Sequence, residues 1–278
     1  QLYLASRDIF LSEVPAREQQ QIQVLSRKEI ITESLKPYFS AEVIEEHLSR
    51  LPPSYLLYQT PEKIREHLEA VQAFDGTQPV TRFVPYENPG GWEIVLACRD
   101  RVGLFNRICV AVMLENFSIF EARLNTRSDG IVVNNLVIRD ALGNLVIPAS
   151  RRNLLLDRIQ RVLAPDGQLP PVPRRVGAPA IGRSSFENQV KISNDSSARF
   201  TVVVVCCADR QGLLVDLSSV LSSMNFNIHF ARIFTEGNRV TDVFYVADAA
   251  GGKITEPGMV SALQQALQDR INPAESHE

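Results

Sequence analysis

The sequence predicts an α+β fold, in which an N-terminal helical segment is followed by two copies of one antiparallel β-sheet unit. The first observation is a repeat: Asp-Arg-Val-Gly-Leu-Phe at 100–105 returns as Asp-Arg-Gln-Gly-Leu-Leu at 209–214, an offset of 109 (209 − 100). The second is that residues 1–77 carry apolar side chains at helical spacing. The third is that strand-like apolar runs flank both copies of the motif.

The repeat extends beyond the motif at the same offset. Asn116-Phe117-Ser118-Ile119 returns as Asn225-Phe226-Asn227-Ile228, and Ala122-Arg123 returns as Ala231-Arg232. An ungapped repeat of roughly thirty-five residues indicates two copies of one folded unit. The function should therefore be sought in that unit.

Composition excludes several classes of protein. The 278 residues suit two or three domains. A net charge of −3 gives no basic footprint for nucleic acid. No apolar run approaches the ~18 residues that span a bilayer, and residues 1–5 do not form a signal peptide. We therefore expect a cytoplasmic protein that binds neither nucleic acid nor membrane, and the absence of an initiator Met favours a fragment of a longer chain.

The cysteines and histidines indicate structural roles. No cysteine belongs to a Cys-x-x-Cys pair, and no two histidines have metal-ligand spacing. The cysteines are interpreted as buried small hydrophobes in a reducing compartment, and His47 and His67 as residues of a helical interface. The four cysteines are Cys98, Cys109, Cys206 and Cys207.

The N-terminal segment divides at its capping signals. Leu35-Lys36-Pro37 breaks one helical pattern, and Ser40 is placed to cap the next. Thr60-Pro61-Glu62 predicts another helix start, with a capping residue, a proline at the first helical position and an acid in the first turn. The residues from Val80 to Tyr86 alternate and precede a turn, so a hairpin should enter the first repeat.

Each repeat is predicted to read strand, helix, strand, strand, helix, with one more strand expected. In the first copy that strand is placed at Gln189–Ile192, after an extended Pro/Gly-rich excursion over 164–188. The second copy is one strand short, or the strand from Val80 to Tyr86 completes an edge. The remaining elements are strands at Trp92–Cys98, Phe200–Cys207, Asn227–Thr235 and Arg239–Ala247, and helices at Ser150–Leu163 and Pro257–Ile271.

The repeated loop has chemistry suited to a free amino acid. Asp100 and Asp209 are placed either to cap the following helix or to receive a ligand ammonium group. Gly103 and Gly212 remove a side chain where the backbone comes close to something. The helix that follows offers free amides and a positive dipole, which suit a carboxylate. A purely structural role, with the aspartate as N-cap and the glycine as turn, remains open for the motif taken alone.

Both repeats resemble ACT domains, the ferredoxin-like βαββαβ modules that bind amino acids and regulate enzymes. In that family the loop typically reads Asp-Arg-Pro-Gly-Leu, and a later Gly-x-Asn-Ile opens the second strand. The usual proline is Val102 and Gln211 here, and the strand-opening asparagine is Ser118 in the first copy. The resemblance implies amino-acid contacts from Asp209, Arg210, Gly212, Leu213, Asn225 and Asn227, and from Asp100, Arg101, Gly103, Leu104 and Asn116. If only one copy binds, the second is expected to, because it keeps Asn227.

The whole chain resembles the C-terminal part of the bacterial PII uridylyltransferase/uridylyl-removing enzyme family. The resemblance gives three regions: 1–77 as the end of an HD hydrolase domain and its helical linker, 78–197 as the first ACT domain and 198–278 as the second. It implies glutamine sensing by the ACT pair, an HD phosphodiesterase and a nucleotidyltransferase elsewhere in the parent with Mg or Mn, and the PII protein as partner in nitrogen control.

No catalytic residue is expected in this chain. It holds no Gly-Ser loop followed by paired aspartates and no His-Asp dyad. Asp8 is a weak candidate for a remnant HD metal ligand, but a lone aspartate cannot hold a metal. Besides glutamine or another small amino acid as ligand, two alternatives stay open: an ACT pair that has lost its ligand and serves as an interaction platform, and a hydrolase remnant using Asp8.

The strand at Ile228–Phe234 predicts a contact between sheets. Both of its faces are at least half apolar, whereas a sheet with helices on one side needs only one apolar face. The second face is therefore expected to lie against another sheet, from the other repeat or from a second chain.

Overall fold

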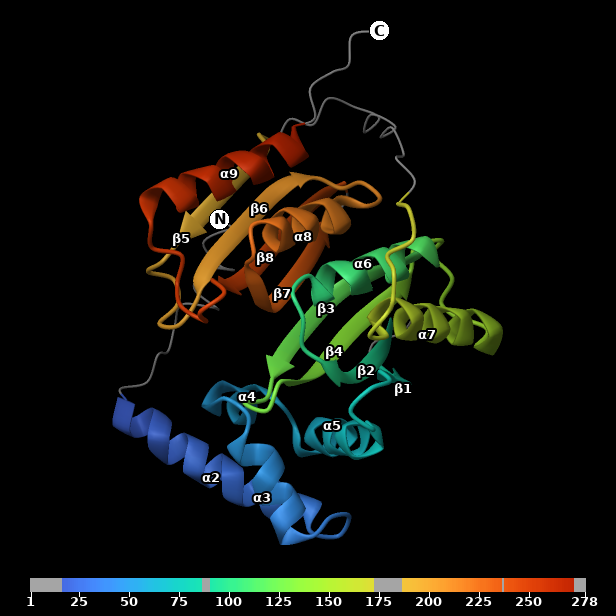
Figure 1. Ribbon diagram of the computed structural model, residues 1–278, viewed down its shortest axis with the longest axis vertical. Coiled ribbons are helices and arrows are strands. Elements are labelled where there is room, and N and C mark those ends of the chain that lie inside the picture. Colours follow the sequence, from blue (N-terminus) through green and yellow to red (C-terminus); the bar gives the residue numbers. More distant parts are fainter. Residues whose placement is uncertain (1–16, 87–90, 173–186, 237, 273–278) are drawn as a thin grey trace, which may run out of the picture. The chain divides into compact units, whose positions relative to one another are not determined.

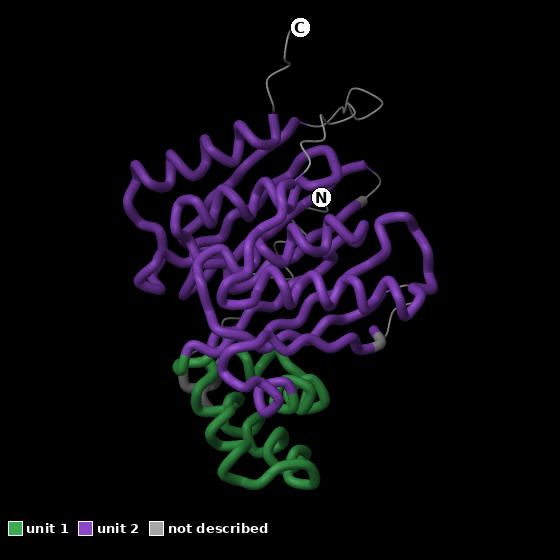
Figure 2. The backbone as a smooth tube through the Cα atoms, turned by 45° about the vertical axis from the view of Figure 1, so that its right-hand side comes forward, with its two compact units in different colours: residues 1–69, 127–129 green, residues 70–126, 130–278 purple. Residues whose placement is uncertain are grey.

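The computed structural model describes residues 17–86, 91–172, 187–236 and 238–272 (Figure 1). The chain divides into two compact units, residues 1–69 with 127–129 and residues 70–126 with 130–278 (Figure 2). Asp8 and the middle of the Pro/Gly-rich excursion, 173–186, lie outside the described residues. The predicted first boundary, at residue 77, falls eight residues after the end of the first unit's main segment at Glu69 (77 − 69).

The first unit is helical, as predicted. It contains α2 (Arg17–Leu35), α3 (Ala41–Ser49), α4 (Pro53–Tyr58) and the start of α5 (Pro61–Ala73). The hydroxyl of Ser40 accepts a hydrogen bond from the Val43 amide, so the predicted cap of α3 is confirmed. The predicted start of α5 is confirmed as well, since the Lys63 amide donates to the Thr60 hydroxyl over 3.4 Å. The unit's core contains Ile31, Leu35, Ile44, Leu48, Leu51, Tyr55, Leu56 and Ile64.

A buried hydrogen-bond chain crosses the first unit. An Arg127 guanidinium nitrogen lies 3.1 Å from His47 Nδ1, and because arginine only donates, Nδ1 accepts. His47 Nε2 then donates to the Tyr55 hydroxyl at 3.4 Å, and that hydroxyl is hydrogen-bonded to His67 Nδ1 at 2.6 Å. Burial lowers the pKa of His47 to about 3, with His67 and Arg127 adding to the effect. The two histidines thus lie buried at an interface between helices, as predicted.

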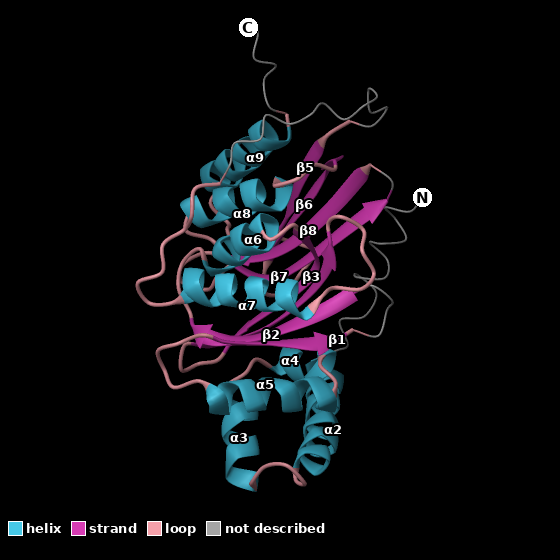
Figure 3. Ribbon diagram, turned by 90° about the vertical axis from the view of Figure 1, so that its right-hand side faces the viewer, coloured by secondary structure: helices cyan, strands magenta, loops and turns pink. Residues whose placement is uncertain are grey.

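The second unit is one eight-stranded antiparallel sheet with the order β1-β2-β4-β3-β7-β8-β6-β5. The first repeat supplies α6 (Leu104–Leu114) and α7 (Ala149–Leu163), and the second supplies α8 (Leu213–Ser223) and α9 (Pro257–Ile271). All four helices cover one face of the sheet (Figure 3). The strands are β1 (Val80–Pro85), β2 (Gly91–Arg99), β3 (Phe117–Thr126), β4 (Ile131–Asp140), β5 (Gln189–Ser193), β6 (Thr201–Ala208), β7 (Asn227–Glu236) and β8 (Arg239–Ala247).

A pseudo-two-fold axis relates the repeats and passes between β3 and β7. Ala122 pairs with Ala231, its own counterpart at the offset of 109 (231 − 122). The same axis passes between α6 and α8. There the side-chain Nδ2 of Asn106 donates at 3.0 Å to the backbone carbonyl of Val215, which is again its counterpart (215 − 106 = 109). The strand order is symmetric about the same axis, because β3, β4, β2 and β1 correspond to β7, β8, β6 and β5. The repeats are therefore joined edge to edge.

The edge strands correct the predicted topology. The residues Gln189–Ser193, assigned from the sequence to the first copy, pair with β6 of the second copy. The first copy is completed by β1, which pairs with β2 in the predicted hairpin. Each repeat therefore takes its fourth strand from the segment before it, and neither is a strand short. The prediction was wrong because the sequence of an edge strand does not indicate which neighbouring strand it will pair with.

The edge-to-edge junction rules out the other repeat as the predicted cover for the second face of β7, while a second chain in that place stays a prediction. The other repeat continues the same sheet and does not cover the second face of β7, where Phe234 is 50% exposed. On the first repeat that face is covered by Ala70, at the end of α5, and by Phe74, directly after it, which pack against Val95 and Ala97. All four cysteines are buried and free, as predicted.

Candidate functional site

The motif glycines form a left-handed turn that starts each helix. Gly103 has φ +75° and Gly212 has φ +83°, and each is the N-cap residue of its helix without a side-chain cap. A Cβ on Gly103 would lie 2.6 Å from the Ser222 hydroxyl, and one on Gly212 would lie 3.3 Å from the Met113 sulfur. Glycine is required here because the turn needs positive φ and touches the other repeat's helix.

The motif aspartates do not cap these helices. The Asp100 amide donates to the Gly130 carbonyl at 2.9 Å, and the Asp209 amide donates to the Asn238 carbonyl at 2.7 Å. The backbone of each aspartate therefore anchors the loop to the adjoining β-hairpin, and its carboxylate makes no capping hydrogen bond to the helix that follows. The purely capping interpretation of the aspartates is wrong.

The motif arginines hold the last carbonyls of each repeat's second helix. Arg101 donates to Val162 and Ala164 at the end of α7, at 2.5 and 3.2 Å. Arg210 donates at 3.2 Å to Arg270 at the end of α9, and it also pairs with Asp216. A cation suits the negative end of a helix dipole. The repeated arginine thus has a structural role that the sequence did not reveal.

A cavity of about 260 Å³ lies between the first repeat's motif loop and the start of β7. It is smaller than the ~300–1,000 Å³ typical of sites for drug-sized ligands, which suits a smaller molecule. Both repeats line it. The first contributes Asp100, Arg101, Gly103, Leu104, Phe105, Asn106, Leu124, Thr126, Val132 and Asn134, and the second contributes Arg199, Ser218, Ser222, Phe226, Asn227, Ile228 and His229.

Two titratable side chains of the cavity have shifted pKa values. Asp100 lies at the rim, where its carboxylate accepts from the Thr126 hydroxyl at 3.3 Å. Packing on one side raises the pKa of Asp100 above 3.8, although the residue is exposed to solvent on the other. His229 stacks on Phe200 with ring centroids 4.6 Å apart. Burial lowers the pKa of His229 to about 4, with Arg199 adding to the effect, so the imidazole is neutral at pH 7.

The cavity brings together only some of the residues predicted from the sequence. Asp100, Arg101, Gly103 and Leu104 line it with Asn227, which comes from the other repeat. The sequence had grouped Asn227 with the loop of its own copy, and the edge-to-edge junction explains the exchange. Six predicted residues do not line this cavity, namely Asp209, Arg210, Gly212, Leu213, Asn116 and Asn225.

Asn116 and Asn225 have a backbone role. Their φ angles are +56° and +63°, and both occupy the left-handed turn that ends the first helix of a repeat. Asparagine tolerates this conformation better than most residues. The Asn116 carbonyl also accepts from the Ala141 amide at 3.0 Å. These contacts explain the repeated asparagine without a ligand.

The sequence missed several residues of the cavity, most notably Asn134. Asn134 and Asn135 interrupt the otherwise apolar run Ile131–Ile138. A polar pair inside a strand was the available signal, because alternate residues face opposite sides of a sheet and one of the two had to be buried under the helices. Asn106, Ser218, Ser222, Arg199 and His229 carried no comparable signal.

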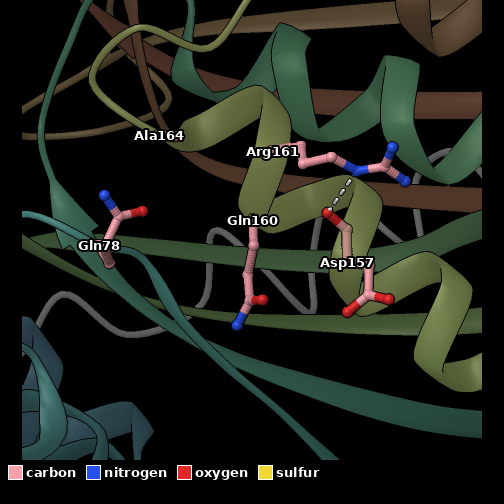
Figure 4. Close-up of a pocket in the computed structure, with 5 residues that line it drawn as sticks. All are labelled: Gln78, Asp157, Gln160, Arg161 and Ala164. Carbon is pink, nitrogen blue, oxygen red and sulfur yellow. Dashed lines mark hydrogen bonds between the residues drawn. The ribbon is translucent and has the colours of Figure 1, made fainter.

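A larger and more open depression, about 550 Å³, lies beside α7 and offers no comparable site. Figure 4 shows its side chains, with Gln160 and Asp157 on the helix and Gln78 apart from them. Arg161 bonds back to the Asp157 carbonyl at 3.2 Å. These groups do not converge on a common point, so the smaller cavity remains the candidate.

No metal site is evident in the described ranges. Within residues 17–86, 91–172, 187–236 and 238–272, no three His, Cys, Asp or Glu side chains are grouped to hold a metal ion. A search of the same ranges found no helix that is long and apolar enough to cross a membrane.

Comparison with known families agrees with this arrangement. Residues 196–272 match the family model described as the ACR family N-terminal ACT domain. The second repeat is an ACT domain. Its pseudo-two-fold partner has the same order of elements and the same glycine turn, so the unit is built as an ACT pair.

Curated relatives match nearly the whole chain. Three of them, each named bifunctional uridylyltransferase/uridylyl-removing enzyme, come from Erythrobacter litoralis, Gluconobacter oxydans and Vibrio atlanticus. They are 28%, 31% and 27% identical over 92%, 89% and 85% of this chain. The chain spans only 28%, 27% and 26% of their lengths. The similarity thus concerns about a quarter of each relative.

One solved structure is a weaker match. A crystal structure of an unknown protein from Galdieria sulphuraria has 13% sequence identity to this chain and covers 65% of it and 91% of its own chain. Its TM-score of 0.22 is too low to support an argument about fold or function.

Proposed function

We propose that this chain is the glutamine-sensing regulatory segment of a bifunctional uridylyltransferase/uridylyl-removing enzyme that acts on the PII protein in the control of nitrogen metabolism. The observation that carries the proposal is the cavity shared by the two repeats of an ACT pair. The enzymatic part of the proposal is supported by the shared name of the relatives. The parent enzyme would work in the cytoplasm with Mg or Mn held outside this chain.

The cavity offers groups for both charges of an amino acid. The carboxylate of Asp100 is at the rim and suits an ammonium group. The first turn of α6, after Gly103, presents backbone amides and positive dipole to a carboxylate. Asn227 adds a side-chain amide that both donates and accepts, which suits the amide of glutamine.

Ligand binding has a direct route to regulation through this geometry. The cavity walls come from both repeats, so its shape depends on how α6 and α8 and the strands β3 and β7 lie together. A ligand that fits one arrangement of the repeats better than another shifts the population toward it. Regulation of the parent enzyme would follow from that shift.

Isothermal titration with L-glutamine, L-glutamate and L-alanine tests the proposal. Glutamine should bind with a stoichiometry of one per chain. Asp100→Asn should weaken binding about tenfold or more, since a charge-assisted hydrogen bond contributes about 1.5–3 kcal/mol. The matched variant Asp209→Asn, in the loop that does not line the cavity, should leave the affinity unchanged. Absence of heat with every amino acid, on folded protein, would favour a ligand-free interaction platform.

The pH dependence of binding provides a second test. An ammonium ligand favours the ionised form of Asp100, whose pKa is raised above 3.8. Affinity for glutamine should therefore be constant near neutral pH and fall as the pH drops through that raised pKa. An affinity that rises on acidification would contradict the assignment of Asp100 to the ammonium group.

A further inference from the structure

In the side-chain amide of Asn134, the oxygen is hydrogen-bonded and the nitrogen is not. Asn134 is fully buried on β4. Its Oδ1 accepts from the Asn125 amide at 3.1 Å, which fixes the orientation of the group. Its Nδ2 is buried and has no hydrogen-bond partner in the part of the chain that the structure describes. Buried donors are rarely left unpaired in native proteins, so such a group calls for an explanation.

A second unpaired donor lines the same cavity. The two terminal nitrogens of Arg101 donate to carbonyls at the end of α7, while its Nε is buried and has no partner among the described residues. Among the cavity-lining residues, every buried side-chain atom left unpaired in the described ranges is therefore an N–H donor, namely Nδ2 of Asn134 and Nε of Arg101. Both of these donors therefore lack an acceptor among the described residues.

The rest of the wall near Asn134 does not supply that acceptor. Leu124 is paired with it across the sheet and is apolar, and Val132 lies two residues before it on the same face. The carboxylate of Asp100 lies at the rim and accepts from Thr126. An acceptor brought by the ligand would give Nδ2 of Asn134 the partner that it lacks among the described residues.

The equivalent position in the second repeat is also polar and buried. Asn134 pairs with Leu96 and Leu124, and Asp242 pairs with their counterparts Val205 and Ile233. Asp242 is 1% exposed, and its Oδ1 likewise has no partner within the described ranges. The fold therefore places an unsatisfied polar atom at this position twice, as a donor under the first loop and as a carboxyl oxygen under the second.

We propose that Asn134 is a ligand-binding residue, whose Nδ2 donates a hydrogen bond to the carboxylate of the bound amino acid, with Arg101 Nε as the charged second donor. A carboxylate fits because it accepts from both donors and balances the guanidinium charge. The ligand then lies with its carboxylate inside and its ammonium at the Asp100 rim. This assignment rests on the proposed function, since it takes the cavity to be the amino-acid site.

Paired titrations with L-glutamine and L-glutaminol, which has an alcohol in place of the carboxylate, test the assignment. Asn134→Asp keeps the shape and the acceptor for Asn125 but replaces the free donor with a carboxyl oxygen. This variant should bind glutamine at least tenfold more weakly than the parent chain and glutaminol within about threefold. The reciprocal variant Asp242→Asn, which is not part of this cavity, should leave both affinities unchanged.

Measurements on the unaltered chain guard against a variant that does not fold. In ¹⁵N-correlated NMR spectra, the side-chain NH₂ signals of Asn134 should move when L-glutamine is added. Glutamine binding with no movement of these signals would overturn the role of Asn134 and leave the proposed function intact. Equal losses for glutamine and glutaminol in Asn134→Asp would also overturn it, because they indicate a scaffold effect. If neither compound binds the unaltered chain, both proposals fail together.

Discussion

The two repeats have the same backbone but carry different chemistry at equivalent positions. Both use a glycine turn, an arginine at the end of the second helix and a left-handed asparagine. Under the motif loop, however, the first repeat buries an amide at Asn134 and the second buries a carboxyl at Asp242. The features that the two repeats share are those that build the fold. The position that differs lines the cavity only in the first repeat, where it is Asn134, so the repeats share an architecture but contribute different residues to the site.

The largest expected effect comes from exchanging Asp242 for the residue that the first repeat carries. Burial raises the pKa of Asp242 from 3.8 to about 8, with Asp209 adding to the effect. Because the folded-state pKa is the higher one, the second unit should lose stability as the pH rises from about 4 to about 8, by several kcal/mol and at most roughly 6. Asp242→Asn should remove that loss.

Urea unfolding between pH 4.5 and 9 measures this difference. The free energy of unfolding of the parent chain should fall with pH and level off above about pH 8. The variant should show a flatter profile and be the more stable protein at pH 8. Parallel profiles for the two proteins would show that Asp242 is ionised in the folded state.

The glycine turns should respond with intermediate and unequal costs. Alanine at either glycine meets a left-handed backbone, which costs roughly 1–2 kcal/mol. Gly103→Ala adds the 2.6 Å approach to the Ser222 hydroxyl, whereas Gly212→Ala meets the Met113 sulfur at 3.3 Å. We expect Gly103→Ala to be the more destabilising variant in thermal unfolding. Adding Ser222→Ala should reduce its cost to that of Gly212→Ala.

The arginine clamps should show a smaller difference. Arg101 holds two carbonyls of α7, while Arg210 holds one carbonyl of α9. Lysine keeps the charge but loses the fork of donors. Arg101→Lys should therefore cost about 1–2 kcal/mol of unfolding free energy and Arg210→Lys less than about 1 kcal/mol. A larger loss for Arg210→Lys would show that its pair with Asp216 contributes more than the helix end does.

The smallest effect is expected where the repeats are alike. Asn116→Gly and Asn225→Gly keep the left-handed turn, so each should change stability by no more than about 0.5 kcal/mol. Glutamine affinity, measured by titration, should also be unchanged, because neither residue lines the cavity. A loss of affinity in Asn116→Gly would restore the ligand role that the sequence predicted for Asn116.

The sequence predicted local elements well because their signals are local. Ser40 and Thr60 mark helix starts by their own hydrogen bonds, and Gly103 marks a turn by its missing side chain. The strand at Val80–Tyr86 was predicted from alternation, which reflects burial on one face, and the strands that flank the motif from their apolar runs. The edge strand at Gln189–Ser193 was misplaced, because pairing depends on which sheet edge the chain meets in space.

The sequence by itself determined that the fold is repeated and that the repeats are α+β. Only the tertiary structure decided how the repeats meet. Pairing of Ala122 with Ala231 brings Asn227 to the other copy's loop. The physical reason is that a site between repeats is made of residues far apart in sequence. Their proximity depends on how the sheet and helices pack about the pseudo-two-fold axis, and no local sequence pattern predicts where that axis lies.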